Sequence, residues 1–141
     1  MRLVLDTNVV FSALLWRGKP HQLLEAVSQR SDTHLFSSPA LLEELADVLA
    51  RPMAAKRLAL IGATANAVLA DYRTVVEMVE PAVAPRVARD ADDDQVIAAA
   101  QAAQADLIVS GDDDLLAIGS YQSIDIINAA EALRYLEAGS D

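Results

Sequence analysis

The first ten residues, MRLVLDTNVV at 1–10, hold the stretch that decides the fold, an apolar run that ends abruptly in a carboxylate, a hydroxyl and an amide. Residues 3–5 have the uninterrupted apolar character of a strand that is buried on both faces. Asp6 stands where that strand would end, and open α/β sheets bind ligands just outside the carboxyl ends of their strands. The same position suits a residue that only caps the next helix, so this stretch leaves both interpretations open.

Composition sets the outer limits of the protein. The chain of 141 residues is 53% hydrophobic, which predicts a single globular domain over residues 1–141 with a core of its own. Cysteine is absent, which excludes disulfides, thiolate metal sites and cysteine nucleophiles and is typical of a cytoplasmic protein. Charged residues interrupt every apolar stretch before the length of about 18 residues that a membrane span needs. We therefore expect a soluble, unexported protein without a membrane partner.

The charge balance is strongly acidic. Asp and Glu total 21 against 11 Lys and Arg, a formal net charge of -10. This excess argues against indiscriminate binding of nucleic acid through a broad basic face. An anionic partner could bind only where positive charge is supplied locally, by divalent cations, by a small basic patch or by a basic protein that covers the acidic surface.

Strand and helix patterns alternate along the whole chain. The pattern predicts an α/β fold, in which a central parallel sheet of about five strands is flanked by helices on both faces. Serine followed by proline at 38–39 and the pair Asn128 and Glu131 are typical helix starts. The predicted strands lie at 2–5, 33–36, 75–79, 107–109 and 124–127, and the predicted helices at 9–16, 20–30, 39–50, 63–74 and 95–104, with short helices around 56 and 115 and a last one after 128.

The predicted helix at 39–50 carries two adjacent acids that face different ways. At about 100° per residue, Glu44 lies on the flank of the apolar stripe beside Leu41 and Val48, whereas Glu43 points away from it. Glu44 is therefore the acid that can reach an interior cleft. Periodicity alone favours the interpretation that both glutamates are ordinary solvated residues, so a functional role for Glu44 depends on the other acids of the chain.

Two further acidic runs follow. Residues 90–94 read DADDD before an alanine-rich helix, where the helix dipole favours anions, although one cap does not require three aspartates. Helical phase does not choose between Asp93 and Asp94. Residues 106–116, DLIVSGDDDLL, repeat the opening design of an apolar strand that ends in carboxylates, with Asp112 first beyond the strand and Asp114 as an alternative helix cap. Carboxylate oxygens are ligands that Mg²⁺ or Mn²⁺ prefers.

The densest basic cluster of the sequence follows the predicted helix at 39–50. It consists of Arg51, Lys56 and Arg57, and it is the first choice for contacts to the phosphates of a polyanionic substrate. Arg17 and Lys19 are the second choice. A solvated helix end explains the same residues without any substrate.

Four motifs in this order and spacing resemble the PIN domain family, and within it the VapC-like ribonuclease toxins of bacterial toxin-antitoxin pairs. They are LDTNVVFSALL at 5–15, SPALLEELADVL at 38–49, DADDDQVIAAAQ at 90–101 and DLIVSGDDDLL at 106–116. Matched position by position, the acidic residues of the family fall on Asp6, Glu44, Asp94 and Asp112. Asn8, Ser110 and Asp114 are the supporting polar positions, and Ser110 stands where the family often has threonine.

The resemblance implies a metal-dependent endoribonuclease. Asp6, Asp94 and Asp112 would hold one or two Mg²⁺ or Mn²⁺ ions, and Glu44 would be a further ligand or would orient water. It also implies an RNA substrate, a cognate antitoxin as partner, and a homodimer or higher assembly. Leu14, Leu15 and Trp16 are candidates for an interface, although burial in the core explains them equally well.

Two alternatives remain, a hydrolase with a different reaction and a binding module without catalysis. An aspartate-nucleophile phosphatase of the haloacid dehalogenase type also begins with a strand that ends in Asp, but that family has a second Asp where this chain has Asn8, and no lysine follows Lys56. A non-catalytic module would bind a basic partner through the acids at the carboxyl ends of the strands, which we call the acidic pole. Metal binding without RNA cleavage would favour the module.

Overall fold

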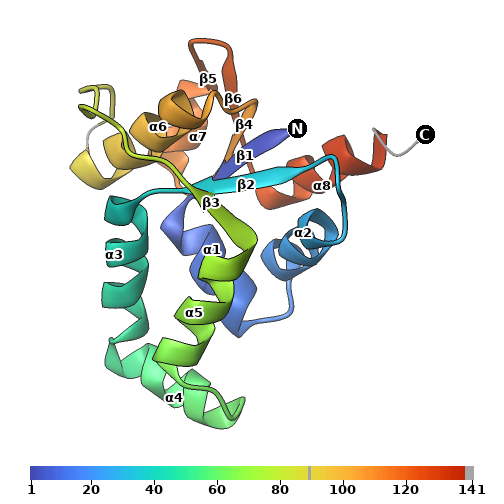
Figure 1. Ribbon diagram of the computed structural model, residues 1–141, viewed down its shortest axis with the longest axis vertical. Helices are drawn as coiled ribbons and strands as arrows, with labels where there is room; N and C mark the ends of the chain where they lie inside the picture. Colours follow the sequence, from blue (N-terminus) through green and yellow to red (C-terminus); the bar gives the residue numbers. More distant parts are fainter. Residues whose placement is uncertain (89, 139–141) are drawn as a thin grey trace.

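The computed structural model describes residues 1–88 and 90–138, and its centre is a single six-stranded sheet (Figure 1). The strand order is β3-β2-β1-β4-β6-β5, with β1 in the interior of the sheet. The first five strands of this order pair in parallel, which confirms the predicted α/β architecture. The strands are β1 Arg2–Leu5, β2 His34–Ser37, β3 Val76–Met78, β4 Leu107–Val109, β5 Ser120–Tyr121 and β6 Ile124–Ile127.

The sequence patterns did not predict β5, which pairs antiparallel with β6 at one edge of the sheet. The two strands are joined by Gln122 and Ser123, whose φ angles are 48° and 70°. Positive φ at both central residues is the geometry of the tight hairpin turn that matches strand twist. Asn and Gly usually signal such a turn, and this chain has neither there.

The helices agree with the predicted ones in number and order, with shifted boundaries. The largest shift concerns α6, which begins at Ala91 rather than at residue 95 and therefore takes the aspartate run into its first turn. Ser38 caps α3, where its hydroxyl accepts the Leu41 N–H, and Asn128 and Glu131 bond each other's backbone N–H groups. The helices are α1 Thr7–Leu15, α2 Lys19–Ser28, α3 Pro39–Leu49, α4 Pro52–Leu60, α5 Ala65–Val75, α6 Ala91–Ala103, α7 Asp113–Ile118 and α8 Ala129–Ala138.

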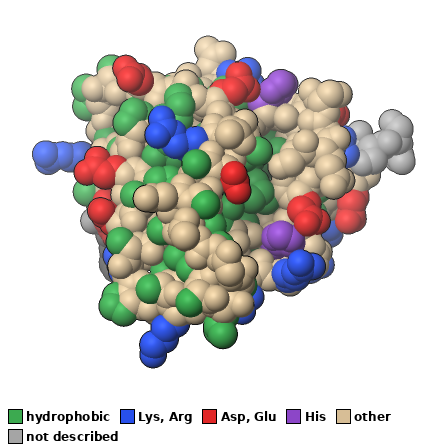
Figure 2. Space-filling model, turned by 60° about the horizontal axis from the view of Figure 1, so that its bottom comes forward, with side chains coloured by type: hydrophobic (Ala, Val, Ile, Leu, Met, Phe, Trp, Pro, Cys, Tyr) green, Lys and Arg blue, Asp and Glu red, His purple; other side chains and the backbone are tan. Residues whose placement is uncertain are grey.

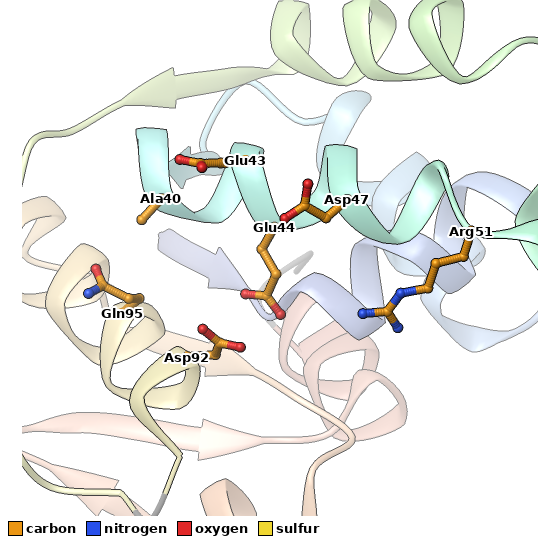
Figure 3. Close-up of a pocket in the computed structure, with 7 residues that line it drawn as sticks. All are labelled: Ala40, Glu43, Glu44, Asp47, Arg51, Asp92 and Gln95. Carbon is orange, nitrogen blue, oxygen red and sulfur yellow. The ribbon is translucent and has the colours of Figure 1, made fainter.

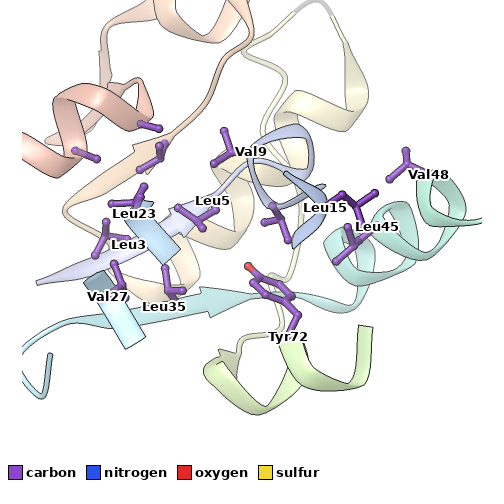
Figure 4. Packing of buried hydrophobic residues seen from close by; sticks show 14 of the residues in the cluster. Leu3, Leu5, Val9, Leu15, Leu23, Val27, Leu35, Leu45, Val48 and Tyr72 are labelled. Atoms are coloured by element: carbon purple, nitrogen blue, oxygen red, sulfur yellow. The ribbon is translucent and has the colours of Figure 1, made fainter. Parts of the chain in front are cut away.

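The central strand β1 is buried on both faces, as its apolar run predicts. Leu3 and Leu5 point into the larger core cluster, which α1, α2, α3 and α8 cover and in which Tyr72 is also buried (Figure 4). Val4 points to the opposite face, where it packs against α6 and α7. Alanines make up much of the buried side of α6, and such small side chains let that helix lie close to the sheet.

The side of the molecule on which α4 lies exposes many hydrophobic side chains. Figure 2, in which the bottom of Figure 1 comes forward, shows hydrophobic side chains spread over this face, with acidic and basic ones scattered among and around them. Met53 and Leu60 of α4 are 68% and 79% exposed. No single helix in the described ranges is long and apolar enough to cross a membrane, although α4 and α5 pass that test of length and composition as a pair bent by 85°.

Candidate functional site

Asp6 lies at the carboxyl end of β1, directly before α1, and is buried. Its carboxylate does not cap the helix through a side-chain hydrogen bond. Instead, Ser110 Oγ at the end of the neighbouring strand β4 donates to Asp6 Oδ2 at 2.7 Å. Burial raises the pKa of Asp6 above its usual value, the bond from Ser110 opposes this shift, and the charge of Asp112 adds to it. Asp6 occupies the N-cap position of α1, where the backbone N–H groups of Thr7 and Asn8 also lower its pKa, and its carboxylate is in addition bonded to Ser110 of the neighbouring strand end.

Asp112 and Ser110 are linked through one backbone group. The Asp112 N–H donates to Ser110 Oγ at 2.9 Å, so a single hydroxyl ties the ends of β1 and β4 together. Asp112 Oδ1 accepts the N–H groups of Asp114 and Leu115, which makes Asp112 the cap of α7. The sequence offered Asp114 as an alternative cap of this helix. In the structure Asp112 caps α7, and the side chain of Asp114 is exposed.

The early start of α6 separates the three consecutive aspartates. Asp90 caps the helix by accepting the Asp92 N–H, so residues 92–94 fill the first turn. Each lies about 100° around the helix from the next, and the three carboxylates therefore face three environments. Asp92 lines a pocket beside Glu44, Asp93 is buried near Asp6 and Asp112, and Asp94 Oδ1 accepts the N–H groups of Val87 and Ala88.

Asp93 is the acid that the structure brings to the centre of the cluster. It is 6% exposed, and its Oδ2 is buried without a hydrogen-bond partner. Burial raises its pKa to about 7, with further contributions from the charges of Asp112, Asp6, Asp90 and Asp114. The position-by-position family match placed this role on Asp94, and helical phase alone did not distinguish the two neighbours.

Glu44 approaches the same cluster from α3. It is half-buried while Glu43 is exposed, as the helical phase predicts. Figure 3 shows the carboxylate of Glu44 turned toward Asp92 across a pocket of about 380 Å³ that both line. Burial raises the pKa of Glu44, and the charges of Asp92, Asp6 and Asp90 raise it further. The other lining residues are Ala40, Glu43, Asp47, Arg51 and Gln95.

Thr7 is a second residue, besides Asp93, that sequence reasoning did not assign. Its Oγ1 is buried without a hydrogen bond of ordinary geometry, a property that it shares within the described ranges only with Asp93 Oδ2. The hydroxyl nevertheless lies beside Glu44 and lowers the pKa of that carboxyl. Thr7 Oγ1 and Asp93 Oδ2 both belong to residues at the acidic pole, where an unbonded buried oxygen is costly unless something binds it. The position of Thr7 next to Asp6 was the only available signal in the sequence. Asn8, predicted as a supporting residue, is exposed on the first turn of α1.

The predicted basic cluster is divided by the fold. Arg51 lines the acidic pocket at the end of α3 (Figure 3). Arg57 Nε donates to the Leu15 carbonyl at 2.8 Å, and its guanidinium lies 5.5 Å from the ring centroid of Trp16, so it fastens α4 to the end of α1. Lys56 is exposed on α4. Arg51 is thus the member of this cluster that adjoins the acids.

The carboxylates suit a hard divalent cation in donor type and in charge. The unbonded Asp93 Oδ2 also offers a free acceptor in the middle of several negative charges. In the part of the chain that the structure describes, however, no three Asp, Glu, His or Cys side chains stand close enough together to hold a metal ion as they are placed. The chemistry of the donors fits a cation, and the carboxylates would have to turn inward to share it.

Comparisons with known proteins bear on the family and the fold of this chain. A family model for the PIN domain matches residues 2–114. The uncharacterized protein MJ1680 of Methanocaldococcus jannaschii is 29% identical over 119 residues, which cover 84% of this chain and 75% of that protein. A chain in the crystal structure of VapBC2 from Rickettsia felis, bound to a promoter DNA fragment, superposes on this chain with a TM-score of 0.61 at 14% sequence identity. The match covers 91% of this chain and 98% of the other chain, and it supports the fold.

Proposed function

Because this chain belongs to the PIN domain family, we propose that it is an endoribonuclease of the VapC-like toxin type, which hydrolyses RNA phosphodiester bonds with the help of Mg²⁺ or Mn²⁺. The observation that carries the proposal is Asp93, a buried acid with an unbonded oxygen, near enough to Asp6 and Asp112 that their charges raise its pKa. Such a crowd of carboxylates is unfavourable by itself and becomes favourable when a cation neutralises it. When bound, the cation would lower the pKa of a water and stabilise charge on the phosphoryl oxygens.

The residues have separate roles in this proposal. Asp6, Asp93 and Asp112 would hold the cation, and Glu44 would be a further ligand or would accept a hydrogen bond from a water. Ser110 keeps the carboxylate of Asp6 oriented through its 2.7 Å hydrogen bond. No side-chain nucleophile is required.

The substrate must approach an acidic surface, which needs local positive charge. Arg51 lies on the rim of the acidic pocket and is the first candidate to bind a phosphate of the RNA. Lys56 and Arg57 were predicted for the same role, but Arg57 is already bonded to the Leu15 carbonyl. We assign them at most a contact to more distant phosphates.

A cognate antitoxin and a homodimer or higher assembly complete the proposal. The Rickettsia felis structure contains a VapBC2 pair, and its likeness in fold to this chain supports an antitoxin partner here. Such a partner would cover the acidic pole and hold the enzyme inactive, so cleavage must be tested on protein freed from any partner.

The test is cleavage of a structured RNA by the purified chain with Mn²⁺, with Mg²⁺ and with EDTA. We expect cleavage with the metals, none in EDTA, and a loss of about a thousandfold or more in Asp6→Asn. Asp71→Asn is the matched control, because Asp71 is an exposed acid on α5. Cleavage that persists in EDTA and in Asp6→Asn would overturn the mechanism, and Mn²⁺ binding without any cleavage would favour the non-catalytic module.

A further inference from the structure

Of the four acids in the proposed site, Glu44 alone lies neither at a strand end nor in the first turn of a helix. It comes from the middle of α3, and its side chain reaches into the acidic pocket (Figure 3). Burial raises the pKa of Glu44, and the nearby charges of Asp92 and Asp6 raise it further. Repulsion from these carboxylates favours conformations in which the flexible side chain of Glu44 turns away from them. A hydrogen-bond donor beside Glu44 would oppose that movement.

Thr7 places a hydroxyl beside this carboxylate. Thr7 is the first residue of α1, directly after Asp6, and it is 2% exposed. Burial raises the pKa of Glu44, and the Thr7 hydroxyl opposes this rise, as a donor to the charged form does. The helices α1 and α3 pack against each other, although α2 and β2 separate them in the chain. The contact between Thr7 and Glu44 therefore joins two elements of the site.

The surroundings of Thr7 Oγ1 leave its donor free for Glu44. Within the residues that the structure describes, this oxygen is buried and makes no hydrogen bond of ordinary geometry, which is costly for a hydroxyl. The β-branched side chain holds the oxygen in few directions. The hydroxyl hydrogen and the last torsion of a glutamate rotate easily, so these two groups can align without movement of either helix.

We propose that Thr7 is a positioning residue, whose hydroxyl donates to the Glu44 carboxylate and keeps it directed toward the acidic pole. The inference rests on the proposed function for the reaction that Glu44 serves. Ser110 orients the carboxylate of Asp6 in the same way, through its 2.7 Å hydrogen bond. Two hydroxyls, one at the start of α1 and one at the end of β4, then orient two of the carboxylates.

A double-mutant cycle of Thr7→Val and Glu44→Ala tests the contact, with urea denaturation in EDTA at about pH 8, where glutamate is ionised. Valine keeps the branched shape of threonine and lacks the hydroxyl. We expect Thr7→Val to raise the equilibrium constant of unfolding by about tenfold, but by less than about threefold when residue 44 is already alanine. A hydroxyl without a partner predicts the opposite sign, because a methyl group is the better occupant of a buried, unbonded site.

Cleavage kinetics test the consequence for the reaction. Thr7→Val should lower kcat by about tenfold and leave KM within about twofold, because Glu44 serves hydrolysis rather than RNA binding. Thr7→Ser keeps the hydroxyl and should retain kcat to within about threefold. Thr33→Val is the matched control, since Thr33 is also buried and donates to the Asp32 carboxylate at 3.2 Å, but it precedes β2 and so lies at the opposite end of the sheet. We expect Thr33→Val to leave kcat unchanged.

The inference is overturned if Thr7→Val leaves the stability of the chain unchanged or increases it, or if Thr7→Ser loses as much kcat as Thr7→Val does. The unfolding measurements require neither RNA nor metal. Coupling between Thr7 and Glu44 in a chain that cleaves no RNA would therefore confirm the contact and contradict the proposed function, so the two failures are distinguishable.

Discussion

Ser110 is a small residue that connects two ends of the candidate site. Its hydroxyl donates to Asp6 Oδ2 and accepts the Asp112 N–H, and it is 0% exposed. A buried hydroxyl with both functions satisfied holds its partners in one geometry. The carboxylate of Asp6 and the start of α7 therefore depend on the same oxygen atom.

Replacing Ser110 tests this connection at the scale of one residue. In Ser110→Ala, Asp6 loses a bond that lowers its pKa, so the carboxylate should become harder to ionise and cleavage should fall by about tenfold. The loss should be greater at low pH, where Asp6 is more often protonated. Ser110→Thr keeps the hydroxyl and should retain most of the activity. Equal losses in both variants across the pH–rate profile would contradict the role of the hydroxyl.

Asp93 predicts an unusual dependence of stability on pH. Its pKa rises from 3.8 to about 7 on folding, so between these values the folded chain binds the proton more tightly than the unfolded chain. The free energy of unfolding from this group therefore falls as the pH rises toward 7. Asp6 and Glu44, whose pKa values are also raised, act in the same direction.

Thermal melts in EDTA at about pH 5 and about pH 8 measure this effect. We expect the metal-free protein to melt at a lower temperature at the higher pH, and Asp93→Asn to reduce the difference. Asp71→Asn should leave the difference as it is, because the side chain of Asp71 is exposed on α5. A melting temperature that rises steadily with pH in the unmodified chain would contradict the burial of charge at Asp93.

At the scale of the elements, the site depends on where helices begin. The first turns of α1, α6 and α7 all lie at the acidic pole, and each starts with or just after an acid. Helix N-termini carry partial positive charge, which stabilises nearby carboxylates that would otherwise repel one another. Glu44 comes instead from the middle of α3, so the orientation of that helix decides whether Glu44 faces the pole.

The cap of α3 offers a test of this dependence. Ser38 Oγ accepts the Leu41 N–H at 3.3 Å and is buried, so Ser38→Ala should lower the free energy of unfolding by about 1 kcal/mol. Urea denaturation measures the change. Ser31→Ala, in the exposed turn after α2, is the control and should change stability by less than about 0.5 kcal/mol. An equal effect of the two substitutions would show that the cap does not stabilise α3.

At the scale of the whole molecule, charge is distributed unevenly. Asp6, Asp112 and the aspartates in the first turns of α6 and α7 gather near the carboxyl ends of β1 and β4, whereas residues 48–70 contain no Asp or Glu. The exposed surface of α4 is correspondingly apolar and basic. Ionic conditions should therefore act mainly through the acidic pole.

A thermal melt of the intact protein with added metal tests whether a cation binds at the acidic pole. A cation that binds only the folded chain stabilises it by about 2.7 kcal/mol at a concentration 100 times its dissociation constant. We expect millimolar Mn²⁺ to raise the melting temperature, EDTA to reverse the effect, and Asp93→Asn to abolish most of it. NaCl at equal ionic strength is the control. A rise of the same size with NaCl would mean that screening, rather than a bound ion, stabilises the chain.

Local patterns in the sequence predicted the architecture because they report on burial along one element. The apolar run before Asp6 indicated a strand covered on both faces, and the phase of α3 distinguished Glu44 from Glu43. The caps at Ser38 and Asn128 followed from side chains that bond the backbone within three residues. All of these features are decided within one or two turns of chain.

Contacts between distant segments remained beyond the sequence. Arg57 bonds a carbonyl 42 residues away, and β5 depends on a turn that no glycine or asparagine marks. Among the crowded aspartates, the start of α6 at Ala91 turned Asp93 toward Asp6 and Asp94 toward Val87. The sequence by itself determined the strands other than β5, the helices and the acids at the strand ends, because periodicity and capping are local. Only the tertiary structure decided which carboxylate faces the cluster, because that depends on how α6 packs across β1 and β4.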